Sequence, residues 1–375
     1  MGNKKGDLKD ISRVFLKLGL TAFGGPAAHI AMMRQEVVVK RQWLTEQHFL
    51  DLIGATNLIP GPNSTEMAIH IGQERGGWKG LLIAGLCFIM PAVLITGCLA
   101  WLYKSYGQLP QIQPFVYGIK PAIIAVIIAA IYPLAQKSLQ TIELGIIGLA
   151  ALILSLIGYS EILVLFGAGF VAMGFAAIRL KRTNSALTFL PLVLTDYSFF
   201  SPKNISLFLS FLKIGAILYG SGYVLFAFLD AELVQKGIIS HRQLIDAIAV
   251  GQFTPGPVFS SVTFIGYQVN GLSGAIISTI GIFLPSFLFV ALLNPLVRKM
   301  RGSKLFAAFL NAVNVASIAL ILVVCYQLGK DSLTNWQEIV IAVGSAFMLF
   351  RFKDINSVFI IIGGSLAGYL LLLLK

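Results

Sequence analysis

Hydrophobic residues along this chain come in long stretches rather than in the short alternations of a soluble fold. Four stretches of about the length of a membrane crossing, 17 to 25 residues, follow one another in the first half of the chain, and four more follow in the second half. The pattern predicts an all-α polytopic membrane protein. The stretches cover approximately 78–103, 111–136, 140–158, 160–178, 273–294, 304–327, 335–350 and 355–374.

Composition supports this class of protein, because 57% of the residues are hydrophobic and only 12% are charged. Soluble domains have roughly 45 to 50% and 25%, respectively. The formal net charge of +12 comes from Lys and Arg residues that gather between the apolar stretches. Basic residues in such loops are typical topology signals, so we expect no nucleic-acid partner.

Catalytic and metal-binding motifs are not evident in the sequence. The three cysteines, Cys87, Cys98 and Cys325, are scattered through apolar stretches, where cysteine packs as a small hydrophobic residue. We find no nucleophile elbow, phosphate-binding loop or paired metal-ligand spacing. The sequence therefore predicts a protein that is not an enzyme and that uses no cofactor or metal.

The chain repeats its own local sequences about 195 residues apart. Phe15–Gly19 returns as Phe211–Gly215, and the tripeptide Pro60-Gly61-Pro62 returns as Pro255-Gly256-Pro257. Duplicated halves around a central site are a recurring plan of secondary transporters. We therefore expect two homologous halves, 1–180 and 205–375, joined by a basic cytoplasmic linker, 181–204. Further matches pair Gly72, Gly77, Gly80, Pro91 and Tyr132 with Gly266, Gly271, Gly274, Pro285 and Tyr326.

The two halves distribute their positive charge unequally. The loop with Arg75 and Lys79 matches the uncharged turn 268–273, and the basic loop 298–304 matches one that carries only Lys104. Because cytoplasmic loops hold the positive excess, equivalent loops are expected on opposite sides of the membrane. The halves are thus predicted to be inverted repeats.

A cytoplasmic linker between inverted halves requires an odd number of crossings in each half. Four clear spans and a broken first segment give five, and therefore about ten transmembrane helices in all. The segments 46–72 and 240–269 would then be intramembrane hairpins with Pro-Gly-Pro at their tips. Ser240 and Gln243 have the spacing of a capping box at the start of the second hairpin. One observation opposes this scheme, because the basic tail Lys4, Lys5, Lys9 and Arg13 would lie outside unless the first segment is itself a hairpin.

Pro-Gly-Pro within a hydrophobic segment breaks a helix, since proline lacks a backbone donor and glycine relaxes the chain. Such a break is tolerated in a membrane where protein buries it or where it lines a wet cavity. The last proline suits the first turn of a new helix, and a helix N-terminus carries roughly half a positive charge. Two tips that meet would therefore suit an oxyanion; the alternative is that they only kink and pack helices. The helix-breaking residues are Pro26, Pro60, Pro62, Pro255 and Pro257.

Residues at and around these breaks are the predicted substrate contacts. The glycines allow close approach of the backbone, and the hydroxyls and amides donate hydrogen bonds without fixed charge. Lys17 and Lys213 would either attract the anion or mark an interface by snorkelling. The full set is Gly24, Gly25, Asn57, Gly61, Asn63, Ser64, Thr65, Gln252, Thr254, Gly256, Ser260, Lys17 and Lys213.

Ionisable groups at membrane depth are the candidates for proton coupling, because burying charge in hydrocarbon is costly. Asp51 and Asp246 match across the repeat, whereas Glu66 and His70 lie one helical turn apart in the first half only. The alternative for each is a structural role, such as pairing with a lysine or solvating a helix end.

Several of these motifs resemble the signatures of the chromate ion transporter family. They are Phe23-Gly24-Gly25-Pro26, the run Asn57 to Ser64, and Gly251-Gln252-Phe253-Thr254-Pro255-Gly256-Pro257. The resemblance covers essentially the whole chain and is to the long, two-domain members. It implies a carrier in the bacterial inner membrane that exports chromate at the expense of the proton gradient and confers chromate resistance.

Other functions fit the same residues. Sulfate and related tetrahedral dianions share the shape and charge of chromate, so a carrier for another oxyanion, in uptake or exchange, is an alternative. A membrane-embedded lipid-handling protein would also use broken helices and a polar groove. As partners we expect chromate or a related divalent oxyanion, membrane lipid and a second copy of the chain in a homodimer.

Overall fold

The computed structural model describes residues 7–23, 25–107, 113–179, 202–219, 222–300, 303–352 and 355–373, and every regular element within them is a helix. Most of the predicted linker 181–204 lies outside these residues, and its last three residues begin α8. The first half contains α1 (Leu8–Thr21), α2 (Gly25–Arg34) with a π-helical continuation (Gln35–Lys40), α3 (Glu46–Thr56), α4 (Asn63–Tyr106), α5 (Gln113–Ser138), α6 (Ile142–Leu156) and α7 (Glu161–Arg179).

The second half repeats this order of helices, as the duplicated sequence predicts. Its first helix is followed by a short helix with a π-helical continuation, then by a helix that leads to the second Pro-Gly-Pro. The elements are α8 (Pro202–Ile217), α9 (Val224–Leu229) with its continuation (Asp230–Val234), α10 (His241–Phe253), a 3₁₀ turn (Val258–Ser260), α11 (Ser261–Met300), α12 (Lys304–Ser332), α13 (Trp336–Arg351) and α14 (Ser357–Leu373).

Apolar helices of membrane-crossing length confirm the predicted class of protein. Five of the described helical stretches are long and hydrophobic enough to cross a membrane, and α6 and α14 are shorter apolar helices. Many large hydrophobic side chains on these helices face outward, for example Leu94 at 63% exposure and Leu163 at 68%. Such a surface suits contact with lipid. The five stretches are Asn63–Tyr106, Gln113–Ser138, Glu161–Arg179, Val258–Leu292 and Lys304–Ser332.

Helices α4 and α11 each double back at a glycine with positive φ. At Gly77 φ is +60°, and at Gly271 it is +59°. A Cβ built on Gly72 would collide with the Gly80 carbonyl, whereas residues eight apart in a straight helix are about 12 Å apart. The long α4 is therefore two helices that turn sharply at Gly77, and α11 repeats the device at Gly271.

The two turns lie at opposite ends of the molecule. Gln268, just before the turn at Gly271, donates a 3.1 Å hydrogen bond to the carbonyl of Ala100, near the C-terminal end of α4. The turn at Gly77 lies at the other end of the same helical segment, about 35 Å away at 1.5 Å per residue. Equivalent parts of the two halves thus face opposite ways, which is the geometry of inverted repeats.

The first segment of the chain turns back rather than crossing the bundle. Leu8 at the start of α1 packs against Gly76, and Trp43, after the π-helical continuation of α2, stacks under the Arg75 guanidinium at 5.1 Å. Both ends of this segment therefore meet at the Gly77 turn. Of the two alternatives for this segment, a fifth crossing or a hairpin, the contacts favour the hairpin, and they place Lys9 and Arg13 at the same end as Arg75.

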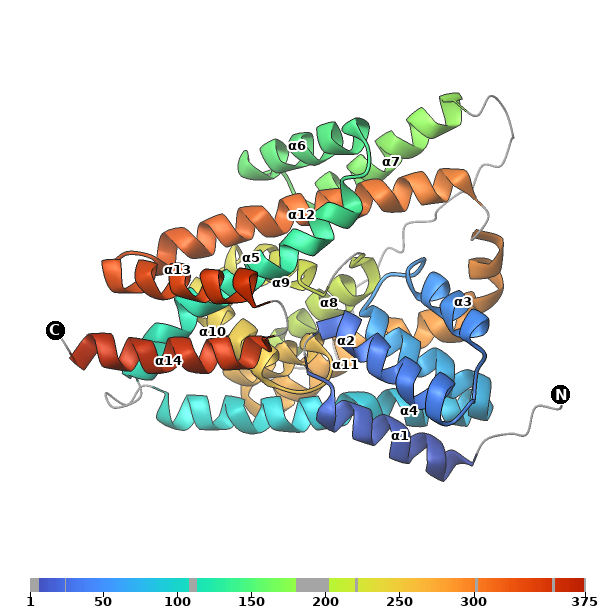
Figure 1. Cartoon of the computed structure of the whole chain (residues 1–375), viewed down its shortest axis with the longest axis horizontal. Coiled ribbons are helices and arrows are strands. Elements are labelled where there is room, and N and C mark those ends of the chain that lie inside the picture. Colours follow the sequence, from blue (N-terminus) through green and yellow to red (C-terminus); the bar gives the residue numbers. More distant parts are fainter. Residues whose placement is uncertain are drawn as a thin grey trace.

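The positions of the terminal helices bear on the predicted count of ten crossings. Figure 1 shows the start of α1 and the end of α14 toward opposite ends of the long axis. Crossings along this axis would bring both to the same end if their number were even, so the arrangement favours an odd number. A segment with a central break has the length of a span whether it crosses or returns, and the sequence therefore leaves the count open.

Helices α3 and α10 begin at hydroxyl caps and lead to the two Pro-Gly-Pro tips. The Thr45 hydroxyl accepts a hydrogen bond from the His48 amide, and Ser240 forms the predicted capping box with Gln243. His48, at the start of α3, lies 3.5 Å from Glu74 near the end of the first part of α4. The chain thus reaches the first tip and comes back to the end from which it started.

Candidate functional site

Each Pro-Gly-Pro tip is bound to the opposite half of the protein. The amide of Gly61 donates a 2.7 Å hydrogen bond to the carbonyl of Leu218, and the amide of Gly256 donates a 2.8 Å bond to the carbonyl of Ala22. Leu218 and Ala22 are equivalent residues, each at the end of the broken first helix of its half. The tips and the breaks therefore form two symmetry-related junctions between the halves.

The junctions lie about midway along the bundle. Gly256 packs against Ala92, which is near the middle of the segment from Gly77 to Tyr106. Positive φ values of +133° at Gly61 and +90° at Gly256 make glycine the residue suited to both tips. Each tip thus lies at the interface between the halves, Gly61 beside Ser286 and Gly256 beside Ala92.

New helices start directly after both tips. Helix α4 begins at Asn63 after Pro62, and the 3₁₀ turn that leads into α11 begins at Val258 after Pro257. The first amides of a helix have no intrahelical acceptor, and they carry its positive dipole end. Buried hydroxyl residues surround these starts, namely Ser64, Thr65, Ser260 and Ser261.

A histidine that the sequence analysis missed joins the two junctions. His29, only 1% exposed, has Nε2 3.1 Å from the Ala22 carbonyl and Nδ1 3.3 Å from the Ser64 hydroxyl. The carbonyl can only accept, so Nε2 carries the proton and Nδ1 accepts from Ser64. Since Ala22 also accepts from the second tip, His29 connects the Gly256 junction to the start of α4.

Other predicted substrate residues make contacts of their own beside the tips. Asn63 donates a 2.7 Å hydrogen bond to Asn57 across the first turn, and the Thr96 hydroxyl donates to Ser260 at 3.3 Å. The Thr254 hydroxyl donates to carbonyls at the end of α10, and therefore caps the helix. Gln252 lies next to the Tyr223 hydroxyl.

The breaks after α1 and α8 face one another. A Cβ built on Gly25, whose φ is +81°, would lie 3.8 Å from the Tyr223 hydroxyl. One on Gly222 would lie 3.8 Å from the Pro26 ring. Gly24, also predicted as a contact, lies outside the described residues.

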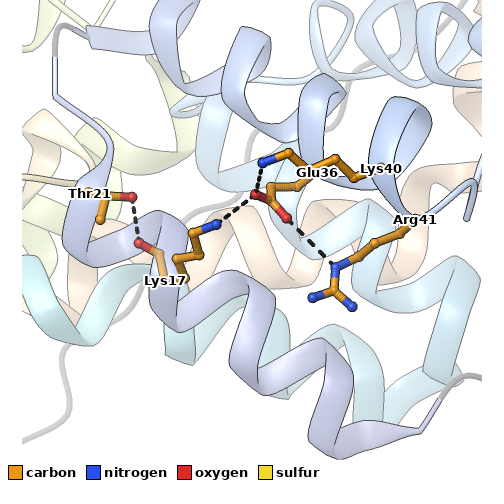
Figure 2. A network of polar contacts seen from close by, with 5 residues as sticks. All are labelled: Lys17, Thr21, Glu36, Lys40 and Arg41. Carbon is orange, nitrogen blue, oxygen red and sulfur yellow. Dashed lines mark hydrogen bonds and ion pairs between the residues drawn. The ribbon is translucent and has the colours of Figure 1, made fainter.

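Lys17 and Lys213 are bound to carboxylates rather than directed at the tips. Lys17 Nζ donates a 2.8 Å hydrogen bond to Glu36, which also pairs with Lys40 and Arg41 (Figure 2). Lys213 repeats the arrangement with Glu232. The hydrogen bond from Lys17 holds the pKa of Glu36 below its usual range. Both lysines are thus neutralised, and the geometry does not support direct contact with substrate.

The four proton-coupling candidates differ in surroundings. Asp246, 4% exposed, accepts a hydrogen bond from Tyr103 of the other half and is within electrostatic reach of Lys120 and Arg242. Asp51 lies partly buried on α3. Glu66 and His70, 0% and 2% exposed, lie on the first turns of α4. Asp246 thus has a lysine and an arginine nearby, whereas Glu66 forms no ion pair with a lysine or arginine among the described residues.

The fold and the site define a membrane transporter built from two inverted halves. A family model described as chromate transporter matches residues 9–173 and 205–369. The chain belongs to the chromate transporter family, as its motifs predicted, and the two matches coincide with its two halves.

Full-length relatives carry the name of the family. The chain is 31% identical to the chromate transport protein of Cupriavidus metallidurans over 96% of this chain and 92% of that protein. It is 29% identical to the probable chromate transport protein of Synechococcus elongatus, over 96% and 95% of the two chains. Its identity to the chromate transport protein of Pseudomonas aeruginosa is 29%, over 95% and 90%. No solved structure matches the chain.

Proposed function

We propose that this protein exports chromate, or a closely related divalent oxyanion, across the bacterial inner membrane, that the proton gradient energises transport, and that the export gives chromate resistance. The observation that carries the proposal is the pair of Pro-Gly-Pro tips, each bound to the opposite half midway along the bundle. Membership of the chromate transporter family and the names of three full-length relatives support the substrate class.

The physical basis for oxyanion binding is the pair of helix starts at the tips. Taking a dianion out of water is very costly, so converging dipoles and hydrogen-bond donors must replace its hydration. Each helix start supplies roughly half a positive charge and unbonded amides. Ser64, Thr65 and Ser260 add buried hydroxyls beside them. Because these donors carry no fixed charge, the site would release the anion as well as bind it.

Alternating access would follow from movement of the halves about the two junctions. Each junction rests on one backbone hydrogen bond between the halves, and rocking of inverted repeats around a central site is the usual mode of such carriers. The hairpins with Pro-Gly-Pro tips would then lie within the membrane, entering from opposite faces.

The end of the bundle that holds the Gly77 turn would face the cytoplasm. Arg41 and Arg75 stack on Trp43 at this end, and Lys79 follows in sequence. The equivalent turn of the second half contains Asn270 and Ser273 and no basic residue. Since cytoplasmic loops hold the positive excess, this assignment puts the beginning of α1 inside and the end of α14 outside. It also puts the start of α8 outside, because Asn204 forms hydrogen bonds with Asn270 and Ser273 beside the Gly271 turn. That position opposes the predicted cytoplasmic location of the linker where it joins α8.

Transport of labelled chromate into inverted membrane vesicles tests the proposal. Vesicles that contain the protein should accumulate chromate, sulfate should compete if the site selects shape and charge, and collapse of the proton gradient should stop accumulation. Absence of chromate and sulfate transport by folded protein would contradict the proposal. An apolar cavity of about 310 Å³ lined by Leu99, Phe253 and Ile361 is suited to lipid chains, so lipid transfer by the same vesicles would then be measured.

A further inference from the structure

The two junctions are alike in backbone and unlike in side chains. At the first junction, a Cβ built on Gly61 would collide with the Glu66 carboxylate and lie 2.8 Å from the Ser286 hydroxyl. At the second junction, the three atoms nearest to the same construction on Gly256 are the Ala92 methyl carbon and two backbone carbonyl oxygens. Ala92 is the repeat equivalent of Ser286, so the hydroxyl beside the first tip is replaced by a methyl group beside the second.

Glu66 lies at the centre of this asymmetry. Its side chain is 0% exposed, and neither carboxylate oxygen has a hydrogen-bond partner among the described residues. The Ser286 hydroxyl, itself 0% exposed, is also without a partner in that set. The equivalent of Glu66 in the second half falls at Ser260 or Ser261, where the register of the repeat shifts, and neither is a carboxylate.

The groups that the structure describes around Glu66 are a serine, a tyrosine and two histidines, and none of them is a lysine or an arginine. Tyr219, from the break after α8, lies close enough to interact electrostatically with Glu66, and its repeat equivalent is the apolar Phe23. His70 is one turn further along α4, and His29 approaches the same helix start through Ser64. No lysine or arginine among the described residues forms an ion pair with Glu66 at this depth.

We infer that Glu66, with Ser286 and Tyr219 around it, is the coupling-cation site of the transporter, occupied by a proton. A buried carboxylate without an ion-pair or hydrogen-bond partner is costly unless it is neutralised. A proton neutralises Glu66 and makes one carboxylate oxygen a hydrogen-bond donor. The Ser286 hydroxyl, which lies beside the same tip and has no partner among the described residues, is an available acceptor once the two side chains approach. Sodium is the other monovalent cation that a carboxylate and hydroxyls can hold, and the test below separates the two.

The position of Glu66 also sets the sense of coupling. It lies in the first turn of α4, the same helix start at which the proposed function places the oxyanion. An ionised Glu66 would itself supply the negative charge that this helix end favours, and it would repel a dianion. The oxyanion and the proton therefore bind together rather than in exchange, and this inference rests on the proposed function. Outward movement of a dianion with one proton carries one net negative charge. The electrical component of the proton gradient, negative inside, drives this movement, whereas the pH difference opposes it, so the energy for export would come from the membrane potential.

Proton movement on binding tests the inference in purified protein. Sulfate or chromate is mixed with the protein in weak buffer with a pH indicator, at a pH where the wild type is mainly deprotonated. We expect uptake of about one proton per bound oxyanion in the wild type and none in Glu66→Gln, which mimics the neutral acid and should still bind. Proton release in the wild type, or unchanged uptake in Glu66→Gln, would overturn the inference.

Two matched variants show whether the effect belongs to this junction. Ser278→Ala removes another fully buried hydroxyl of α11 without a partner among the described residues and should leave proton uptake unchanged, whereas Ser286→Ala should shift its pH dependence. Asp246→Asn removes another deeply buried carboxylate and should also leave uptake unchanged; loss of uptake in Asp246→Asn with retention in Glu66→Gln would assign coupling to Asp246 instead. Binding that depends on sodium and not on pH would replace the proton by sodium and contradict our choice.

A second readout separates this inference from the proposed function. If the wild type binds neither oxyanion, the proposed function fails, and the cation site is then tested by thermal unfolding without substrate. The difference in midpoint between the wild type and Glu66→Gln should change with pH at constant ionic strength. A difference that is constant with pH and with sodium concentration would show that Glu66 binds no cation.

Discussion

The amide of Gly61 in the first half donates its hydrogen bond to the carbonyl of Leu218 in the second half, and Gly256 does the same to Ala22 in the first half. Each half therefore completes the broken helix of the other. Neither Pro-Gly-Pro tip can be moved without changing the opposite half, which links the two helix starts mechanically. The account predicts that the tips act as one unit.

Substitution of either tip glycine should abolish transport. In Gly61→Ala and Gly256→Ala, an alanine must adopt a backbone conformation with positive φ. This strain costs the folded state about 1 to 3 kcal/mol. At Gly61 the new Cβ also collides with the Glu66 carboxylate. Thermal midpoints and transport rates check this. Gly54→Ala on α3, where a Cβ meets open space, is the matched control and should retain both.

Loss of His29 should clearly reduce the transport rate and should lower the stability of the folded protein less. His29→Ala removes the link from the Ala22 carbonyl to the Ser64 hydroxyl, and leaves a buried hydroxyl with one partner fewer, at about 1 to 3 kcal/mol. We expect a reduced transport rate with folded protein recovered in detergent. A wild-type rate in this variant would show that the connection between the junctions has no functional role.

The Lys17–Glu36 pair should contribute a small stability that depends on pH. Because Lys17 lowers the pKa of Glu36 in the folded protein, the contribution is present above the unfolded pKa of about 4.3 and is lost as pH falls through the folded pKa. Lys17 is 56% exposed, so we expect about 0.5 kcal/mol or less. Thermal midpoints between pH 3 and 7 should show this acid-side loss in the wild type and its absence in Glu36→Gln.

Cysteine labelling should place equivalent turns on opposite faces of the membrane. Trp78 and Leu272 are repeat equivalents beside the two glycine turns, and their side chains are 63% and 69% exposed. In a variant without the three native cysteines, an impermeant thiol reagent should modify Trp78→Cys only from the cytoplasmic face and Leu272→Cys only from the outer face. Labelling of both from one face would refute the inverted arrangement.

The sequence predicted the parts of the fold that follow from local chemistry. The capping box of Ser240 and Gln243 and the duplicated tips rest on short-range rules, and the structure contains them. The crossing count could not be fixed from the sequence, because the first break, between Ala22 and Gly25, makes a return and a crossing equally long. Only contacts of Leu8 and Trp43 with the Gly77 turn decide between them.

The site was less predictable for two physical reasons. The tips bind backbone carbonyls, and no side chain in the sequence marks which carbonyl will be bound. His29 was missed because the equivalent residue of the other half is Leu225, so a search for polar residues that recur in both halves passes over it. The pairing of Lys17 with Glu36 did have a signal, since Lys213 and Glu232 recur at the same spacing of 19 residues. Reading the repeat for pairs of charges, rather than for single lysines, would have found it.

Equilibrium binding of labelled chromate to purified protein in lipid nanodiscs tests the central claim most directly, with the wild type compared to Gly61→Ala, Gly256→Ala, the double variant and Gly54→Ala. If the two tips form one oxyanion site, each tip variant alone should lose binding about as completely as the double variant, while Gly54→Ala binds like the wild type. The account would be contradicted if each single variant lost only part of the binding free energy and the two losses summed to that of the double variant. It would also be contradicted if both single variants still bound chromate.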